Sequence, residues 1–276
     1  MTNDYLVKLL NAYWFAPPVA LWRAIELRAV SQLRCERPLL DLGCGDGLIG
    51  QALFGAHQGG NVGLDPWMDQ LRRAAQLNVY RHVVQGLGDA LPYPDGYFST
   101  VFSNSVLEHV SDLQPVVREA ARVLGFGGRF VFTVPSDAFR RMLDGYVRRM
   151  TAGDSAGAEA YASTVDDRLA HHHYHTPDEW EAILSDAGMT LLTAEYYVPQ
   201  QVERLWDRMN HRYGIDGSPS PWKLLASPRL RPLGFQRLLR RLVANRLSDR
   251  WRSYYEMDVE SGQKGGGLLV VAQRKE

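Results

Sequence analysis

The stretch Asp41-Leu42-Gly43-Cys44-Gly45-Asp46-Gly47 decides the fold of this chain of 276 residues. It lies between a short apolar run and a segment of helical composition. Glycines at such a turn let the backbone bend sharply and let a ligand approach the main chain closely. A dinucleotide-binding fingerprint would have glycine or alanine where Leu48 stands, and the chain has no Gly-Lys-Ser or Gly-Lys-Thr of a phosphate loop. The flanking carboxylates of Asp41 and Asp46 instead favour a cationic ligand.

Strand-like and helix-like segments alternate on both sides of this turn. The predicted strands are Pro38–Leu42, Asn61–Asp65, Arg81–Gln85, Phe98–Ser103, Arg129–Val134, Thr190–Val198 and Gly267–Ala272. Apolar residues at helical spacing predict a helix over Leu113–Leu124, and Thr176 with Pro177 marks the start of another, over Pro177–Ala187. The pattern predicts an α/β fold, a Rossmann-like sheet with helices on both faces.

Acidic residues follow successive predicted strands. Asp65 ends the second strand, where a carboxylate can accept hydrogen bonds from two ribose hydroxyls. Asp89 follows the third strand and can accept a hydrogen bond from an exocyclic amine. Because ligands of such sheets bind beyond the carboxyl ends of the strands, these acids predict a pocket for a ribosylated, amino-bearing, positively charged ligand.

Four motifs occur in the order that is typical of one enzyme family. They read LDLGCGDG, then GLD, then GDALPYPDGYFSTVFSNSVLEHV, then REAARVLGFGGRFVFTVPS, and they cover 38–135. The chain resembles the class I S-adenosylmethionine-dependent methyltransferases, in particular the type 11-like branch that acts on small molecules. The resemblance implies a seven-stranded sheet of six parallel strands and one antiparallel strand, Gly267–Ala272, and S-adenosylmethionine as the cofactor.

The resemblance also implies roles for individual residues. The glycine turn would contact the methionine moiety, Asp65 the ribose, and Asp89 with Ala90 the adenine, while Trp67 could lie against the adenine ring. The loop 104–109 would border both cofactor and acceptor. The cofactor-binding residues implied in this way are Asp41, Gly43, Cys44, Gly45, Asp65, Pro66, Trp67, Asp89, Ala90 and Asn104. Cys44 is expected to be a small loop residue without a nucleophilic role.

Methyl transfer from a sulfonium requires alignment of the acceptor and, for a hydroxyl or amine acceptor, removal of a proton. His109 is the candidate general base, and a purely structural histidine that orients its loop is the alternative. A second histidine cluster comprises His171, His172, His173 and His175. Adjacent histidines point in different directions, so we expect a solvated or acceptor-facing loop and no metal site.

The sequence suggests four parts. Residues 1–36 form an apolar helical lid, and residues 37–198 form the cofactor-binding core, with an insertion at 137–176. Residues 199–263 form an aromatic and basic helical cap, and residues 264–276 supply the final core strand. A polar loop is expected over 151–157.

The segment 222–252 contains nine basic residues and one acidic residue, whereas the whole chain has a net charge of zero. Phe235, Leu238, Leu239, Leu242, Val243, Leu247 and Trp251 follow helical spacing and predict an amphipathic basic helix. The helix could cap the acceptor with its arginines solvated, grip an anionic acceptor, or lie on an anionic membrane. A cap that also contacts the acceptor is favoured. Nucleic acid is disfavoured, since no RNA-binding module accompanies the segment.

Composition narrows the class of protein further. Apolar residues make up 45% of the chain and charged residues 22%, as in ordinary globular proteins. Two cysteines are too few for a disulfide framework, and no signal peptide or membrane span is recognised, so a cytoplasmic protein is expected. The favoured function is methyl transfer to a small, hydrophobic or anionic acceptor. The alternatives are a non-catalytic or membrane-associated protein on the same fold and, less favoured, an RNA methyltransferase.

Overall fold

The computed structural model describes residues 4–55 and 60–276 and divides the chain into two compact units. The sheet unit comprises residues 29–137, 170–196 and 267–276. The helical unit comprises the residues up to Arg28 together with 138–169 and 197–266. Each unit is therefore assembled from three separate segments of the chain.

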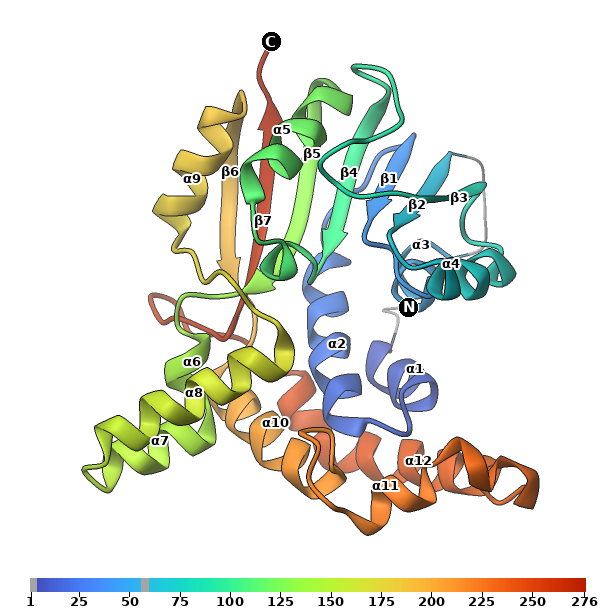
Figure 1. The fold of residues 1–276 in the computed structure, drawn as a ribbon, viewed down its shortest axis with the longest axis vertical. Coiled ribbons are helices and arrows are strands. Elements are labelled where there is room, and N and C mark those ends of the chain that lie inside the picture. The colour runs from blue at the N-terminus through green and yellow to red at the C-terminus, as the bar shows by residue number, and fades with distance from the viewer. Residues whose placement is uncertain (1–3, 56–59) are drawn as a thin grey trace. The chain divides into compact units, whose positions relative to one another are not determined.

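The sheet unit contains a seven-stranded sheet of order β3-β2-β1-β4-β5-β7-β6 (Figure 1). Its strands are β1 (Leu39–Leu42), β2 (Asn61–Asp65), β3 (His82–Gln85), β4 (Phe98–Asn104), β5 (Leu124–Pro135), β6 (Met189–Tyr196) and β7 (Gly267–Arg274). The first five strands pair in parallel, and β7 pairs antiparallel with both β5 and β6. The predicted sheet of six parallel strands and one antiparallel strand is confirmed.

The register of the parallel strands brings their carboxyl ends to one edge of the sheet. Leu42 of β1 pairs with Leu64 of β2, and Asp65, the last residue of β2, pairs with Gln85, the last residue of β3. The turns that follow β1, β2 and β3 therefore emerge side by side. This edge is where the acids of the sequence motifs are gathered.

Helices in the sheet unit bury apolar side chains against the strands. They are α3 (Leu48–Phe54), α4 (Met68–Ala74), α5 (Leu113–Val123) and α9 (Pro177–Asp186), with 3-10 turns η1 (Ala75–Leu77) and η2 (Leu107–His109). Val116, Val117 and Ala120 of α5 join Trp180 and Leu184 of α9 in one buried cluster with the strands. Helix α9 begins with a capping box between Thr176 and Glu179, as the sequence Thr-Pro predicts for its start.

Most predicted boundaries agree with the structure to within two residues, and two differ by more. Strand β5 begins at Leu124 and not at Arg129, because the glycine-rich stretch 125–128 continues the strand, and the register with β4 shifts between Phe98 and Thr100. The predicted loop over 151–157 shrinks to 152–154, since α7 extends to Thr151 and α8 starts at Ser155.

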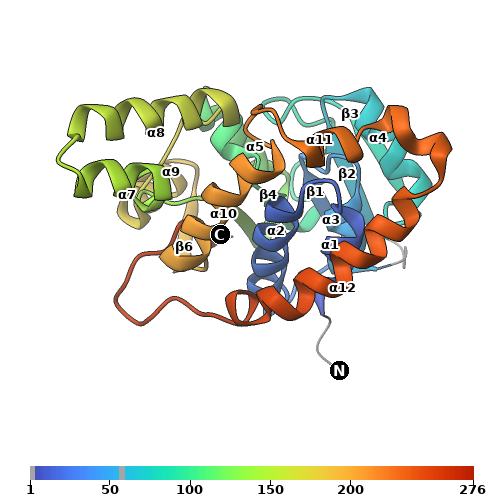
Figure 2. The ribbon, with the colours of Figure 1, turned by 90° about the horizontal axis from the view of Figure 1, so that it is seen from below.

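The helical unit contains the remaining helices (Figure 2). They are α1 (Tyr5–Ala12), α2 (Pro17–Val30, which continues into the sheet unit), α6 (Phe139–Met142), α7 (Asp144–Thr151), α8 (Ser155–Leu169), α10 (Gln200–Tyr213), α11 (Pro221–Leu225), η3 (Pro228–Leu233) and α12 (Gln236–Tyr255). Rings of Trp22, Phe139 and Trp206 pack together with centroids 5.4–5.9 Å apart. The carboxylate of Asp207 accepts hydrogen bonds from the backbone N–H of Gly145 and the hydroxyl of Tyr161. Side chains from all three segments thus hold this unit together.

Helix α12 packs along α1, but not through the stripe that its sequence suggests. Its buried residues are Ala244, Ser248, Trp251 and Tyr255. Of the seven residues expected on the apolar face, only Trp251 is buried, whereas Leu238 and Leu242 are exposed. Arg252 fixes the pair of helices at one end through a 2.6 Å ion pair with Asp4, which also caps α1. Within the described part of the chain, no helix is both long enough and apolar enough to cross a membrane.

Candidate functional site

The glycine turn after β1 is held against the end of β2 by main-chain hydrogen bonds. The N–H groups of Gly43 and Cys44 both donate to the carbonyl oxygen of Leu64, over 2.8 and 3.0 Å. Gly43 has a φ of +76°, and a Cβ placed on it would lie 2.4 Å from a γ-carbon of Val106. Only glycine satisfies both constraints, so the turn can pass directly beneath the loop that follows β4.

Asp65 is fixed by the backbone on both of its carboxylate oxygens. Oδ2 accepts a hydrogen bond of 2.9 Å from the N–H of Gly45, and Oδ1 accepts one of 2.9 Å from the N–H of Trp67. A carboxylate oxygen has a further lone pair for another donor. The side chain is therefore oriented in advance and can still accept hydrogen bonds from a ligand.

Asp41 lies deeper, where its buried carboxylate accepts a hydrogen bond of 2.5 Å from the hydroxyl of Tyr80. Burial raises the pKa of Asp41 to about 7, and the negative charge of Asp65 adds to this, while the Tyr80 hydrogen bond acts in the opposite direction. Burial also raises the pKa of the Cys44 thiol, with the charges of Asp41 and Asp65 adding to the effect. Cys44 is therefore a packed thiol, as expected, and not an activated nucleophile.

A pocket of about 590 Å³ opens at this edge of the sheet. Six of its lining residues are predicted site residues: Gly43, Asp65, Pro66, Trp67, Asp89 and His109. The other predicted residues do not line it. Asp41 and Cys44 lie buried behind the glycine turn, Gly45 holds Asp65, and Ala90 and Asn104 lie next to lining residues in the chain.

The loop after β4 also lines the pocket through Ser105 and Val106, which belong to the stretch 104–109 that the resemblance implies would border the cofactor and the acceptor. Ser105 has a φ of +50°, which is unusual for a residue other than glycine. Its N–H donates to both the carbonyl oxygen and the hydroxyl oxygen of Thr133 on β5, which hold it in this conformation. Such strained backbone is concentrated at functional sites.

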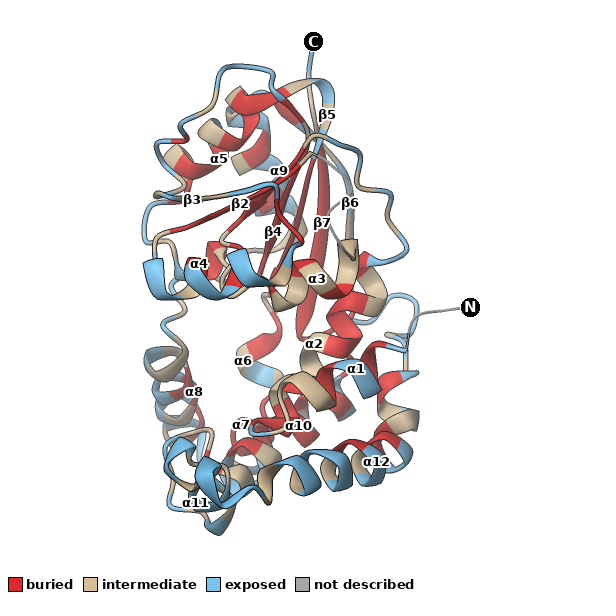
Figure 3. Cartoon of the chain, turned by 90° about the vertical axis from the view of Figure 1, so that its right-hand side faces the viewer, coloured by how far each residue is buried: buried red, intermediate tan, exposed pale blue. Residues whose placement is uncertain are grey.

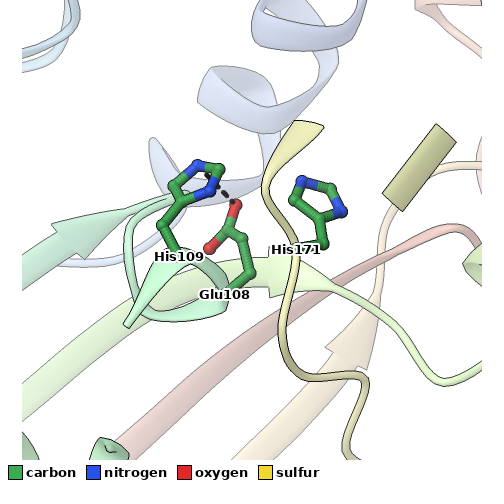
Figure 4. Close-up of side chains that lie close together, drawn as sticks. All are labelled: Glu108, His109 and His171. Carbon is green, nitrogen blue, oxygen red and sulfur yellow. Dashed lines mark ion pairs between the residues drawn. The ribbon is translucent and has the colours of Figure 1, made fainter. Parts of the chain in front are cut away.

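His109 stands at the end of η2 with its two ring nitrogens in different surroundings (Figure 4). Nδ1 lies 3.0 Å from the carbonyl oxygen of Ala170 and must carry a proton to bond with it, whereas Nε2 lies 3.9 Å from Oε1 of Glu108. The Glu108 side chain is almost fully buried, and that of His109 is 44% exposed. With Nδ1 engaged by the backbone, Nε2 is the ring nitrogen that faces the buried Glu108 side chain.

His171 completes this group from a distant part of the chain. Its ring lies 5.4 Å from the His109 ring, and its Nδ1 is 3.0 Å from the Tyr174 hydroxyl. One ligand atom each of Glu108, His109 and His171 lies within 4.8 Å of the others, so the three could hold a metal ion. No local pattern links Glu108 to His171, and sequence reasoning grouped His171 only with its neighbours. His173 bonds instead to the carbonyl oxygen of Val110, and the His175 ring stacks on His173.

Known proteins are similar in sequence to the part of the chain that forms this pocket. The family model described as a methyltransferase domain matches residues 40–132. The 27-O-demethylrifamycin SV methyltransferase of Amycolatopsis mediterranei is 30% identical over 220 residues, which are 74% of this chain and 74% of that protein. The chain belongs to the class I S-adenosylmethionine-dependent methyltransferases. Membership of this family confirms the predicted family, enzyme class and cofactor.

Two further methyltransferases are similar to this chain, one in sequence and one in structure. The sarcosine/dimethylglycine N-methyltransferase of Halorhodospira halochloris is 29% identical over 194 residues, covering 66% of this chain and 63% of that protein. This chain therefore spans just under two thirds of that relative's length. A methyltransferase of Thermotoga maritima, described as a possible histamine N-methyltransferase, has a TM-score of 0.59 at 14% identity, covering 98% of this chain and all of that one. At that identity the likeness supports the methyltransferase fold alone.

Proposed function

We propose that this protein transfers a methyl group from S-adenosylmethionine to a small, hydrophobic or anionic acceptor. The observation that carries the proposal is that Asp65, Asp89 and His109 line one pocket at the carboxyl ends of the strands. The two acids suit a ribosylated, amino-bearing cofactor, and the histidine suits proton removal from an acceptor. The three residues support this function together because they line the same pocket.

The pocket residues suit the cofactor chemically. The N–H groups of Gly45 and Trp67 already orient the Asp65 carboxylate, which would accept hydrogen bonds from the ribose hydroxyls. Asp89, with Ala90, would hold the adenine, and the indole of Trp67 would cover one face of that ring. The glycine turn 43–45, which includes Cys44, would contact the methionine part, with Asp41 behind it and Asn104 beside the reacting end.

Bound S-adenosylmethionine supplies an electrophilic methyl group on a sulfonium, so the protein needs no covalent intermediate. The chain must hold the acceptor in line with that methyl group and remove the proton that a hydroxyl or amine gives up. We propose that Nε2 of His109 takes up the acceptor's proton, because Nδ1 uses its own proton to bond to the Ala170 carbonyl oxygen. The buried carboxylate of Glu108 would stabilise the imidazolium that forms.

By their names, one relative methylates an oxygen atom of a demethylrifamycin, and another methylates the nitrogen of sarcosine or dimethylglycine. A general base serves both kinds of acceptor. We accordingly propose oxygen or nitrogen as the methylated atom. A cytoplasmic site of action stays a prediction.

Incubation of the full chain with methyl-labelled S-adenosylmethionine and a panel of small hydroxyl, amine and carboxylate compounds tests this function. We expect label in at least one small organic product, and much less label at the same low cofactor concentration when Asp65 is replaced by asparagine. A chain that binds S-adenosylmethionine but labels nothing across the panel or in cell extract would point to a non-catalytic binding protein. Label in RNA alone would contradict the proposed acceptor class.

A further inference from the structure

Helix α12 carries two apolar stripes, and only one of them is covered. Ala244, Ser248, Trp251 and Tyr255 face the rest of the helical unit and are buried. Leu238 and Leu242 are spaced one turn apart and project from the opposite side, with 62% and 55% of their surface exposed. An exposed pair of leucines in the first half of α12 is therefore unaccounted for by packing within the unit.

The preceding turns add more exposed leucines to the same part of the chain. Leu224 and Leu225 end α11, and Leu233 ends η3, and all three are exposed (Figure 3). Single exposed leucines are common on protein surfaces, but five within 224–242 are a concentration of apolar groups. We call the segment 224–242 with these five leucines the apolar–basic segment.

Arginines are interleaved with these leucines. Arg229, Arg231, Arg237, Arg240 and Arg241 are all exposed. Within the part of the chain that the structure describes, no ion pair joins any of these five to a carboxylate, and Arg240 has only a 3.4 Å hydrogen bond to Asn11. The apolar–basic segment itself contains no acidic residue. Its positive charge is therefore not compensated locally.

We propose that the apolar–basic segment is a peripheral membrane-binding surface that inserts its leucines into the headgroup region of an anionic bilayer. Its positive charge complements anionic lipid headgroups, and its leucines gain by leaving water. Arginine side chains can bury their stems along the apolar region while their guanidinium groups reach the phosphates. A nucleic acid would reward the arginines alone and leave the five leucines in water. The surface is independent of methyl transfer.

Sedimentation of the full chain with lipid vesicles tests this surface without any measurement of activity. The vesicles contain phosphatidylcholine alone, or phosphatidylcholine and phosphatidylglycerol in equal parts, at low salt and at about 1 M salt, where the Debye length is about 3 Å. We expect the wild type to bind the anionic vesicles and to bind the neutral vesicles much more weakly. Failure to bind anionic vesicles at low salt would overturn the proposal.

Two sets of variants separate charge from insertion. Replacing Arg229, Arg237 and Arg241 with glutamine should weaken binding to anionic vesicles by about 100-fold at low salt, at about fivefold per arginine, and much less at high salt. The matched control removes three exposed arginines from the sheet unit, Arg73, Arg81 and Arg118. Equal losses in the two triple variants would show a nonspecific charge effect and contradict the proposal.

The second set tests the leucines. Replacing Leu238 and Leu242 with asparagine should weaken binding by at least about tenfold at both salt concentrations, because insertion does not depend on screening. The matched control is Leu192→Asn on β6, which is also exposed. Unchanged vesicle binding by the double variant would overturn insertion. Sedimentation velocity compares the oligomeric states of the wild type and the double variant. A dimeric wild type and a monomeric variant would show that the leucines contact a second copy of the chain, which would contradict the membrane proposal.

Discussion

The backbone N–H of Gly45 donates a hydrogen bond of 2.9 Å to Oδ2 of Asp65. This contact joins the turn after β1 to the last residue of β2, which are the two parts of the site that the methionine and ribose ends of the cofactor would occupy. A change at either residue therefore alters both parts.

Replacing Asp65 with asparagine should weaken S-adenosylmethionine binding by at least about tenfold. The variant loses charge-assisted hydrogen bonds to the ribose, each of roughly 1.5–3 kcal/mol, and its amide group cannot accept from a backbone N–H on both sides. Calorimetric titration measures the affinity, with Asp69→Asn on the exposed side of α4 as the control. Equal affinities for the two variants would contradict the ribose assignment.

Replacing Gly43 with alanine should lower the free energy of unfolding by roughly 2–5 kcal/mol. Left-handed backbone costs a non-glycine residue about 1–2 kcal/mol, and the new methyl group would overlap Val106 at 2.4 Å, an overpacking cost of about 1–3 kcal/mol. Urea unfolding measures the change.

Two companion variants separate these contributions. Gly45→Ala has the same kind of left-handed backbone, with a φ of +53°, but nothing within 4 Å of the new Cβ, so it should show the backbone cost alone. Adding Val106→Ala to the Gly43 variant should recover the overpacking part. If Gly43→Ala and Gly45→Ala destabilise the protein equally, the close approach to Val106 has no energetic weight.

His109→Gln should lower turnover by roughly 10²–10⁴-fold while S-adenosylmethionine affinity stays within a few-fold of the wild type. Glutamine can keep a hydrogen bond to the Ala170 carbonyl but cannot take up a proton. His172→Gln, one residue beyond the cluster partner His171, is the control. Parallel loss of turnover and cofactor binding would make His109 a structural residue of its loop.

Chelation separates the two chemical uses of the Glu108, His109 and His171 group. A general base needs no ion, so dialysis against a chelator should leave turnover unchanged. Elemental analysis of the purified protein and turnover before and after dialysis are the measurements. Loss of activity that added zinc restores, together with metal lost in His171→Ala, would instead show that these three residues bind a metal ion.

The raised pKa of Asp41 predicts a pH-dependent loss of stability. Below about pH 4 the carboxyl is protonated in both the folded and unfolded states. Between about 4 and about 7 the unfolded chain releases this proton while the folded protein keeps it, so the free energy of unfolding falls as the pH rises. The loss is on the order of 4 kcal/mol, at about 1.4 kcal/mol per pH unit.

Comparison with Asp41→Asn isolates this effect, because asparagine can still accept the hydrogen bond from Tyr80 but does not titrate. Urea midpoints at a series of pH values should show the wild type losing stability relative to the variant up to about pH 7 and no further loss above it. A constant difference across the series would show that Asp41 is ionised throughout.

Much of the sheet unit could be predicted because its signals are local. Most strands contain a short apolar run, Asp65 ends one of these strands, and Asp89 follows the end of the next strand by four residues. The start of β5 was missed because Gly125, Gly127 and Gly128 have low strand propensity, and pairing with β4 outweighs that propensity. The contact between His109 and His171 was missed because it depends on where the chain returns to the sheet after α8, which no local pattern specifies.

The α12 helix shows a different limit of sequence reasoning. Its periodicity correctly predicts a helix, but of the seven residues expected on its apolar face only Trp251 is buried. The small side chains of Ala244 and Ser248 allow a neighbouring helix to approach closely, and large Trp251 and Tyr255 complete that contact. Hydrophobicity alone could not distinguish the stripe that packs from the stripe that stays exposed.

The position of β7 between β5 and β6 has a consequence for the order of folding during synthesis. β6 pairs with β7, yet β7 is synthesised only after the intervening residues 197–266. Until then β5 and β6 each present an unpaired strand edge, the kind of surface that promotes aggregation or recruits chaperones. Nascent chains stalled before Gly267 should therefore be protease-sensitive in β6, and release of the last strand should act as the step that closes the sheet.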